Sequence, residues 1–412
     1  MQRMKVLLLC TQFPYPPRTG FKMRVYQLAR QLAARHDLTL LSYAEPGEAA
    51  ARDALASEMQ VHVVEKSYIP GLRRRVRQAA SIASSRPYAC RSVYTDEMQH
   101  TIEQLCREQS FDVVQLESTL FCQFEFPDDV AVVLDEHNIE FELYKRMYQT
   151  ERSAARRAYN LVEYLRFRRF EQRSWRCVDG VLVCSEREVS IVRGNAPTVP
   201  LGVAPNGVDL EYFAPSTEDV DPCTIVFNGY LDYRPNHDAA VHLVHDIWPL
   251  IRSRHPGARL ELVGRYEHAD LRPLQAPGVT ITGEVPDVRP HIGRATVVTV
   301  PIRMGGGTRL KVVEALAMGK SVVSTSVGCE GVAVRDREHL LIADDPASFA
   351  AAILDVIASR ELRAELGRSA RELAEREYSW DVAGDRIEAL YAQVAGERNR
   401  ERAGPSEPAL AR

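Results

Sequence analysis

The residues with the clearest chemical potential lie in one segment, VVTVPIRMGGGTRLKVVEALAMGKSVVSTSVGCEG, at 297–331. Its apolar start is too dense for a half-solvated strand and indicates a buried parallel strand. Three residues that let the backbone approach a ligand closely come next, namely Gly305, Gly306 and Gly307. Arg309 and Lys311 then place positive charge at the start of the expected helix. This combination favours an anion, most simply a diphosphate.

Two further residues extend this interpretation. Thr308 is a candidate N-cap for the helix, whose unpaired N–H groups and positive dipole end also attract an anion. Glu314 lies about one and a half turns into the helix, and its carboxylate can accept a pair of vicinal hydroxyls. The segment therefore predicts a nucleotide site for a diphosphate and a ribose. The alternative is an ordinary strand-to-helix turn with solvated charges, which the spacing of the three charged residues disfavours. Neither a dinucleotide G-x-G-x-x-G fingerprint nor a P-loop is present.

The surrounding pattern predicts an α/β protein in which short apolar strands alternate with helices. In the first half we expect strands at 5–10, 38–43, 62–64, 113–116, 130–134 and 180–184, with one long helix at about 140–176. In the second half we expect strands at 225–228, 259–263, 279–281, 297–302 and 321–324. Right-handed crossovers would make each half a doubly wound, Rossmann-like sheet, which binds ligands beyond the carboxyl ends of its strands.

Two loops after strands in the first half carry candidate residues. Gly20 follows the first strand and a proline-rich stretch, and would let the backbone approach a ligand at a helix N-terminus. His137 lies in DEHNIE, 135–140, where polar residues directly after a buried strand suggest a cleft or water. A neutral His137 can donate a hydrogen bond to a sugar oxygen, and Asp135 is a candidate base. The alternatives are that Gly20 belongs to an ordinary loop before a helix, and that His137 and Asn138 cap the helix that follows them.

Length and composition limit the number of domains, the partners and the location that can be expected. With 412 residues the chain is expected to form two domains, joined at the Pro- and Gly-rich stretch near 197–205. A net charge of −4 gives no reason to expect nucleic-acid binding. The apolar run at the N-terminus is too short for a signal peptide, and no run reaches the ~20 residues of a membrane span. The eight cysteines form no C-x-x-C pair, which favours a reducing cytoplasm over disulfides or a zinc site.

The GGGTRLK loop with Glu314 resembles the donor-nucleotide signature of retaining GT-B glycosyltransferases of family 4, in particular a bacterial subgroup with this loop. The family pattern has two Glu seven residues apart; here Gly306 stands in place of the first, which leaves the identity of the sugar open. The resemblance implies two facing Rossmann-like domains with a cleft between them and a C-terminal helix that crosses back. It divides the chain into an acceptor domain (1–200), a donor domain (201–378), the crossing helix (379–395) and a disordered tail (396–412).

For the site, the resemblance assigns Glu314 to the ribose hydroxyls, His137 to the donor sugar and the Gly20 loop to the donor phosphates and acceptor. Relatives often carry an Arg and a Lys after the first strand of the donor domain, whereas here Arg234 is the only nearby cation. Leaving-group charge would therefore rest mainly on Arg309 and Lys311. No metal and no cofactor is expected beyond the nucleotide-diphosphate sugar, because fixed cations and a helix end take the place of a metal.

The implied function is transfer of a hexosyl or N-acetylhexosaminyl group, with retention of configuration, to a glycan, lipid-linked or small-molecule acceptor in glycan, exopolysaccharide or glycoconjugate biosynthesis. Two alternatives remain: a GT-B-fold sugar-nucleotide epimerase or hydrolase, and a non-catalytic GT-B-like partner subunit. The arginines at 73–77 and 156–173 fit either a solvated amphipathic helix or contact with an anionic membrane or lipid diphosphate. The expected location is therefore the cytoplasm, with the inner face of the cytoplasmic membrane as an alternative.

Overall fold

The computed structural model describes residues 3–48, 52–66, 86–151, 153–216, 220–305 and 309–403, with side chains up to 398. The chain divides into two compact units, each built on its own parallel sheet. The first unit is Met1–Ala204 with Ala383–Arg412, and the second is Pro205–Val382.

The first unit is organised around a seven-stranded sheet in the order β3-β2-β1-β4-β5-β6-β7, and each neighbouring pair is parallel. Its strands are β1 (Lys5–Cys10), β2 (Asp37–Ala44), β3 (Gln60–Glu65), β4 (Val113–Leu116), β5 (Ala131–Glu136), β6 (Gly180–Val183) and β7 (Leu201–Val203). In β1 every residue after Lys5 is buried, as expected for a strand covered on both faces. The order places β1 and β4 at the switch point of a doubly wound sheet.

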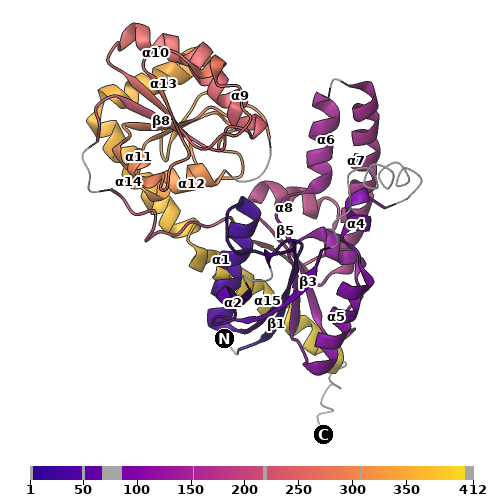
Figure 1. The fold of residues 1–412 in the computed structure, drawn as a ribbon. Coiled ribbons are helices and arrows are strands. Elements are labelled where there is room, and N and C mark those ends of the chain that lie inside the picture. The colour runs from indigo at the N-terminus through magenta and orange to yellow at the C-terminus, as the bar shows by residue number, and fades with distance from the viewer. Residues whose placement is uncertain are drawn as a thin grey trace. The chain divides into compact units, whose positions relative to one another are not determined.

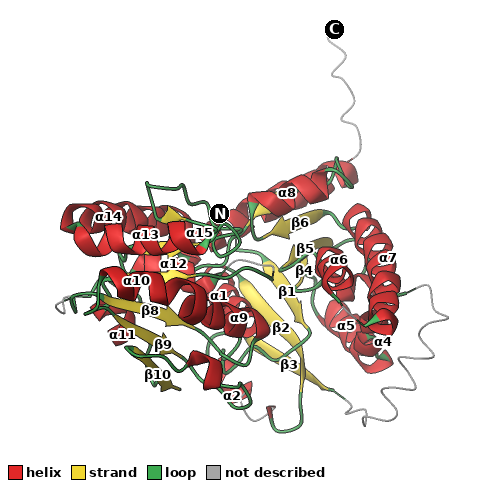
Figure 2. Ribbon diagram, turned by 90° about the horizontal axis from the view of Figure 1, so that it is seen from above, coloured by secondary structure: helices red, strands yellow, loops and turns green. Residues whose placement is uncertain are grey.

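Helices cover both faces of this sheet, with α1 (Gly20–Arg35) on one face and α5 (Asp96–Glu108) on the other (Figures 1 and 2). The remaining helical elements of the unit are α2 (Arg52–Leu55), α4 (Tyr88–Val93), the 3-10 helix η2 (Thr119–Gln123), α6 (Glu140–Thr150), α7 (Ala154–Cys177) and α8 (Glu186–Arg193). Helices α6 and α7 run side by side as a hairpin (Figure 1).

The C-terminal helix α15 (Trp380–Ala403) begins in the second unit, and from Ala383 onward it belongs to the first. Its side chains pack where strand residues are small: a Cβ on Gly180 would lie 3.0 Å from Val394 Cγ1. Arg35 of α1 pairs with Asp385 and Glu388 on the same helix, at 2.6 and 3.0 Å. The helix therefore crosses back to the first unit.

The second unit contains a six-stranded sheet in the order β10-β9-β8-β11-β12-β13, again with parallel pairs. Its strands are β8 (Thr224–Asn228), β9 (Arg259–Val263), β10 (Val279–Gly283), β11 (Val297–Val300), β12 (Val322–Ser324) and β13 (Leu341–Ile342). Its helical elements are α9 (Arg234–His242), the π-helix η3 (Leu243–Ile247), α10 (Trp248–Arg254), the 3-10 helix η4 (Arg272–Leu274), α11 (Arg289–Arg294), α12 (Leu310–Ala317), α13 (Pro346–Ala358) and α14 (Arg360–Glu377).

The structure confirms each strand expected from the sequence, with ends that differ by up to two residues, and adds β7 and β13, which are only three and two residues long. The single helix expected at 140–176 is wrong, because the chain turns between α6 and α7. There the Glu151 carboxylate accepts a hydrogen bond from the Ser153 N–H at 2.9 Å, a local bond that competes with the helix. The tail expected from 396 onward is also misplaced, since α15 continues to Ala403.

Candidate functional site

In the second unit, glycines mark the carboxyl ends of three neighbouring strands. Gly229 and Gly264 directly follow β8 and β9, Gly283 ends β10, and all three have positive φ. A Cβ on Gly264 would lie 2.0 Å from the Gly229 carbonyl oxygen, so only glycine fits there. The Gly229 N–H donates to Val263 and the Gly264 N–H to Gly283, at 2.8 and 3.1 Å. At Gly229, Gly264 and Gly283 the carboxyl end of the sheet therefore carries backbone without side chains, and we call these three positions the glycine edge.

Lys311, one residue inside α12, reaches this glycine edge. Its Nζ donates to the Asn228 carbonyl oxygen and, at 2.9 Å, to Asn236 Oδ1. The ammonium also lies 4.5 Å from the centroid of the Phe227 ring, a cation–π contact. A Cβ on Gly229 would lie 2.6 Å from Nζ, so the glycine makes room for the lysine. Burial lowers the pKa of Lys311 to about 7.

Glu314 follows Lys311 by three residues on α12. Burial raises the pKa of its carboxyl to about 7, and the Lys311 ammonium opposes that shift. Within the described part of the chain the carboxylate has no hydrogen bond or ion pair. The ionised form of this half-buried carboxyl can therefore accept hydrogen bonds from a ligand.

The loop before α12 is described only in part. Gly306, Gly307 and Thr308 lie outside the described residues, so their predicted roles stay predictions. Gly305 has φ of +109°, and a Cβ there would lie 2.9 Å from an Arg309 guanidinium nitrogen. The described part of the helix begins at Leu310, with Arg309 at the N-cap position and no side-chain capping hydrogen bond from it.

Arg309 is nearly buried, and one of its Nη atoms contacts the Met304 carbonyl oxygen at 3.4 Å. Arg234 is exposed and begins α9, next to Pro235, whose Cγ would lie 3.4 Å from a Cβ on Gly305. The structure thus gathers Gly305, Arg309, Lys311, Glu314 and the start of α9 at one edge of the second sheet. Asn236, in the first turn of α9, accepts a hydrogen bond from Lys311 through its side-chain oxygen.

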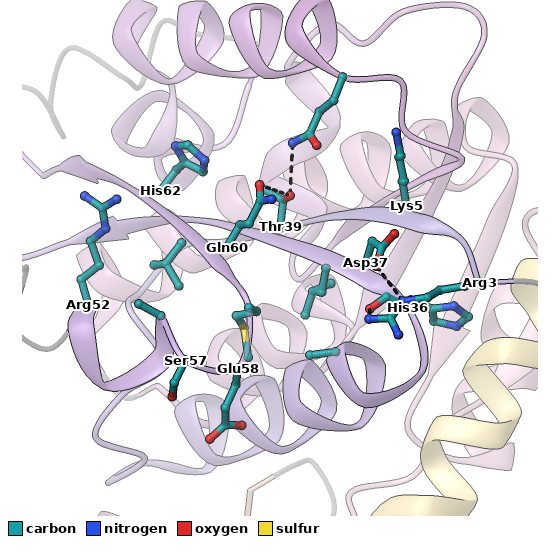
Figure 3. Close-up of a pocket in the computed structure, with 16 residues that line it drawn as sticks. Arg3, Lys5, His36, Asp37, Thr39, Arg52, Ser57, Glu58, Gln60 and His62 are labelled. Atoms are coloured by element: carbon teal, nitrogen blue, oxygen red, sulfur yellow. Dashed lines mark hydrogen bonds and ion pairs between the residues drawn. The ribbon is translucent and has the colours of Figure 1, made fainter.

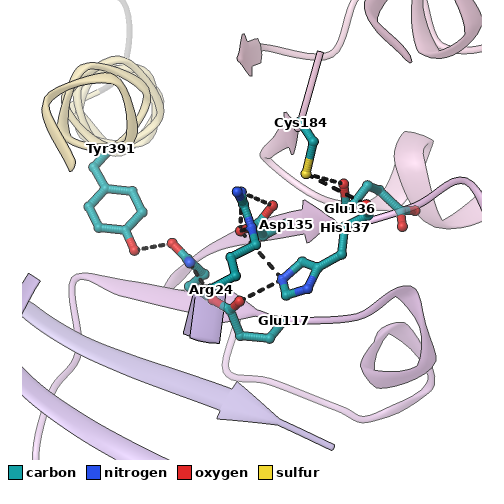
Figure 4. Close-up of polar contacts among 8 residues, drawn as sticks. Arg24, Glu117, Asp135, Glu136, His137, Cys184 and Tyr391 are labelled. Carbon is teal, nitrogen blue, oxygen red and sulfur yellow. Dashed lines mark hydrogen bonds and ion pairs between the residues drawn. The ribbon is translucent and has the colours of Figure 1, made fainter. Parts of the chain in front are cut away.

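In the first unit, His137 follows β5 and lies in a buried polar cluster (Figure 4). Its Nε2 is 2.8 Å from Glu117 Oε2 and 3.6 Å from Asp135 Oδ2. The His137 side chain is 12% exposed, whereas both carboxylates are fully buried. Sequence reasoning missed Glu117, which is the residue directly after β4.

Asp135 forms a two-pronged ion pair with Arg24 of α1, whose guanidinium lies 2.9 and 3.0 Å from the two carboxylate oxygens. Arg24 is 2% exposed, so this ion pair is shielded from solvent. Because the guanidinium occupies both oxygens of Asp135, this carboxylate is a poor candidate for a catalytic base.

Gly20 is the first residue of α1 and is exposed, with Thr19 as the N-cap. The next residue, Phe21, lies against His137, with 4.9 Å between ring centroids. The Gly20 loop and His137 are therefore neighbours at the carboxyl edge of the first sheet. Lys22, two residues into the helix after Gly20, pairs with Glu48 at 2.6 Å.

Glu117, Asp135 and His137 also form the group of potential metal ligands among the described residues, with ligand atoms within 4.8 Å of one another. Their atoms already satisfy one another, since Arg24 holds Asp135 and Glu117 accepts from His137. A cation would have to displace a buried guanidinium, which makes these residues a poor fit for a metal.

A cavity of about 650 Å³ opens elsewhere in the first unit (Figure 3). Its lining includes Lys5, Asp37 and Gln60, the first residues of β1, β2 and β3. It therefore lies at the amino ends of the strands, whereas doubly wound sheets bind ligands at the carboxyl ends. None of the residues predicted from the sequence lines it.

On α7, Arg168 and Arg169 are exposed, but so is Leu165, while Glu163 and Glu171 are buried, so the helix does not separate an apolar face from a charged one. The arginines at 73–77 lie outside the described residues. Within the described ranges, no helix is both long and apolar enough to cross a bilayer.

Comparison with known proteins assigns a family model to each unit. Residues 19–212 match the model for Glycosyltransferase Family 4, and residues 222–359 match the model for Glycosyl transferases group 1. Among curated proteins, an uncharacterised 44.6 kDa protein in the cps region of Klebsiella pneumoniae is 20% identical over 85% of this chain and 90% of its own. A GDP-mannose-dependent phosphatidylinositol monomannoside mannosyltransferase of Corynebacterium glutamicum is 26% identical over 44% of this chain and 54% of its own.

Solved structures resemble the chain over 95 to 96% of its length. Sucrose-phosphate synthase from Thermosynechococcus elongatus has a TM-score of 0.71 at 18% identity, covering 96% of this chain and 100% of its own. HepE from Anabaena, in complex with UDP, has a TM-score of 0.67 at 15% identity, and the match covers 95% of this chain and 100% of HepE. Together with the two parallel sheets, these likenesses establish the α/β GT-B fold expected from the sequence.

Proposed function

We propose that this chain, a glycosyltransferase of the group 1 and family 4 type, transfers a hexosyl or N-acetylhexosaminyl group from a nucleotide-diphosphate sugar to an acceptor hydroxyl with retention of configuration. The observation that carries the proposal is the arrangement on α12. Lys311 is held at the glycine edge of the second sheet, and Glu314, whose carboxylate has no partner among the described residues, lies three residues further along the same helix.

The second unit supplies the donor contacts in this proposal. Arg309 and Lys311 stabilise the diphosphate, which gains charge as the bond from the sugar C1 to the phosphate oxygen breaks. The N–H groups of the loop, including Gly305, Gly306, Gly307 and Thr308, contribute to the same anion. Glu314 accepts from the ribose hydroxyls, and exposed Arg234 adds a weaker electrostatic contribution.

His137 and the Gly20 loop are assigned to the transferred sugar and to the acceptor side of the reaction. The acceptor oxygen forms its bond to C1 on the face that the diphosphate leaves, its proton passes to the departing phosphate oxygen, and no protein nucleophile takes part. The donor site needs no metal, because two fixed cations and a helix N-terminus serve the leaving group.

The nucleotide, the sugar and the acceptor are tested together. UDP is bound by HepE and GDP-mannose is the donor of the Corynebacterium enzyme, so UDP- and GDP-sugars come first in a thermal-shift screen, followed by dTDP- and ADP-sugars. The protein should be stabilised by one base class and should then transfer that sugar to a glycan, lipid-linked or small-molecule acceptor. NMR of the product should show the anomeric configuration of the donor; an inverted product would reject the retaining mechanism.

The pathway and location are part of the proposal. The relative in the Klebsiella cps region suggests exopolysaccharide or another surface glycan as the product class. We place the enzyme in the cytoplasm, where nucleotide sugars are made, with contact at the inner face of the membrane if the acceptor is lipid-linked. Sedimentation with anionic vesicles, compared with neutral ones, measures that contact directly.

A further inference from the structure

A chain of buried polar side chains runs from the C-terminal helix α15 to His137 (Figure 4). We propose that Glu117 is a positioning residue that sets the hydrogen-bonding state of His137, and that Tyr391 on α15 holds Glu117 in place through Gln115. The inference rests on the proposed contact of His137 with the sugar, and it adds the residues that determine how the imidazole meets it.

Each link of this chain is a direct hydrogen bond. The Tyr391 hydroxyl donates to Gln115 Oε1, and Gln115 Nε2 donates to Glu117 Oε1 at 2.5 Å. Glu117 Oε2 then lies 2.8 Å from His137 Nε2. Tyr391, Gln115 and Glu117 are all fully buried, so water does not compete for these groups.

The direction of the chain follows from the chemistry of its members. Burial raises the pKa of Tyr391 well above its ordinary value, so the phenol keeps its proton and donates. Gln115 therefore turns its carbonyl oxygen toward Tyr391 and its NH₂ group toward Glu117. That NH₂ group holds Oε1, which leaves Oε2 of the same carboxylate directed at the imidazole.

The consequence for His137 is a fixed tautomer. A carboxylate only accepts hydrogen bonds, so the hydrogen of the neutral ring lies on Nε2, between Glu117 and Asp135. Nδ1 is then the ring atom left for a ligand, and within the described ranges it has no hydrogen-bond partner. A neutral ring accepts at Nδ1, and only a protonated ring donates there. This differs from the sequence-based expectation that neutral His137 donates to the sugar.

The experiment reads the imidazole directly. Histidine labelled with ¹⁵N is incorporated into the full chain, and the His137 signals are those absent from His137→Ala. In the wild type the neutral ring should show the Nε2–H pattern. Glu117→Gln is isosteric but can present an NH₂ group to Nε2, so it should move the ring toward the Nδ1–H form. Tyr391→Phe should shift the same signals less, because only the far end of the chain is broken.

Kinetics and a control variant separate positioning from structure. Glu117→Gln should lower kcat about tenfold or more and Tyr391→Phe a few-fold, each with nucleoside-diphosphate affinity unchanged. Asp385→Asn weakens the contact of α15 with Arg35 and lies outside the chain, so it should leave the His137 signals unchanged. His137 signals that are the same in Glu117→Gln and wild type would overturn the inference. An Nε2–H tautomer that responds to Glu117→Gln, combined with full activity of His137→Ala, would instead reject the proposed role of His137.

Discussion

Lys311 Nζ lies 2.9 Å from Asn236 Oδ1, although the two residues are 75 positions apart in the chain. The amide of Asn236 in turn donates to the Tyr230 carbonyl oxygen at 2.9 Å, so the asparagine is itself held in place. A long, flexible side chain is thereby fixed at the strand end before any ligand arrives. Preorganisation of this kind makes a cation effective toward a leaving group, because little reorganisation remains to be done in the reaction.

Removal of either cation beside the glycine edge should slow transfer. Lys311→Ala and Arg309→Ala should each lower turnover at least about tenfold, since loss of such a contact costs about 2–5 kcal/mol in the transition state. The double variant should be inactive, and Arg234→Ala should have a smaller effect because Arg234 is exposed. Arg303→Ala is the matched control. Like Arg309, Arg303 lies between β11 and α12, but its guanidinium pairs with Asp238. Equal losses in all four single variants would point to a general charge effect.

Replacement of His137 should affect the sugar rather than the nucleotide. His137→Ala should depress turnover by a factor on the order of 10² with little change in nucleoside-diphosphate affinity. Steady-state kinetics with the sugar donor and calorimetry with the diphosphate alone make the comparison. A parallel loss of affinity and turnover would show that the residue was assigned to the wrong part of the donor.

Donor binding should be linked to protonation of Lys311. Burial holds the pKa of the free lysine at about 7, and a bound diphosphate favours the ammonium form. Lys311 should therefore take up a proton on binding at pH 8, where the free lysine is largely neutral, whereas at pH 6 the lysine is already charged and contributes little. Calorimetry in buffers of different ionisation enthalpy measures this uptake. Lys311→Met should abolish it at pH 8; an unchanged uptake in that variant would assign the proton to another group.

Glu136, at the end of β5, should make stability depend on pH. Burial raises the pKa of its carboxyl from 4.5 to about 8, opposed by the Trp175 indole N–H that donates to it at 2.8 Å. Because the folded pKa is the higher one, the stability this group contributes is complete below about 4.5 and is lost as the pH rises toward 8. Glu136→Gln keeps an acceptor for Trp175 and cannot ionise. Its gain in Tm over the wild type should be larger at pH 8 than at pH 5, and an equal gain at both would contradict the assignment.

The sheets could be predicted from the sequence because buried parallel strands are continuous apolar runs, as in β1 (Lys5–Cys10). The GGGTRLK segment was predictable as a candidate site because its glycines and charges are adjacent in the chain. The cluster around His137 could not be predicted in the same way. Its members Arg24, Glu117 and Tyr391 are far apart in the sequence and belong to no common motif. Only the register of β4 and β5 and the docking of α1 and α15 bring them together.

The central claim is that α12 builds a metal-independent nucleotide-diphosphate site in which Lys311 and Glu314 hold the two ends of the ligand. Calorimetric titration of the wild type, Lys311→Ala and Glu314→Ala with UDP and GDP, in the presence of EDTA, tests it most directly. The account predicts that one of the two nucleotides binds the wild type without metal and that each variant binds it at least about tenfold more weakly. Binding that requires Mg²⁺ or Mn²⁺, or that is unchanged in both variants, would contradict it.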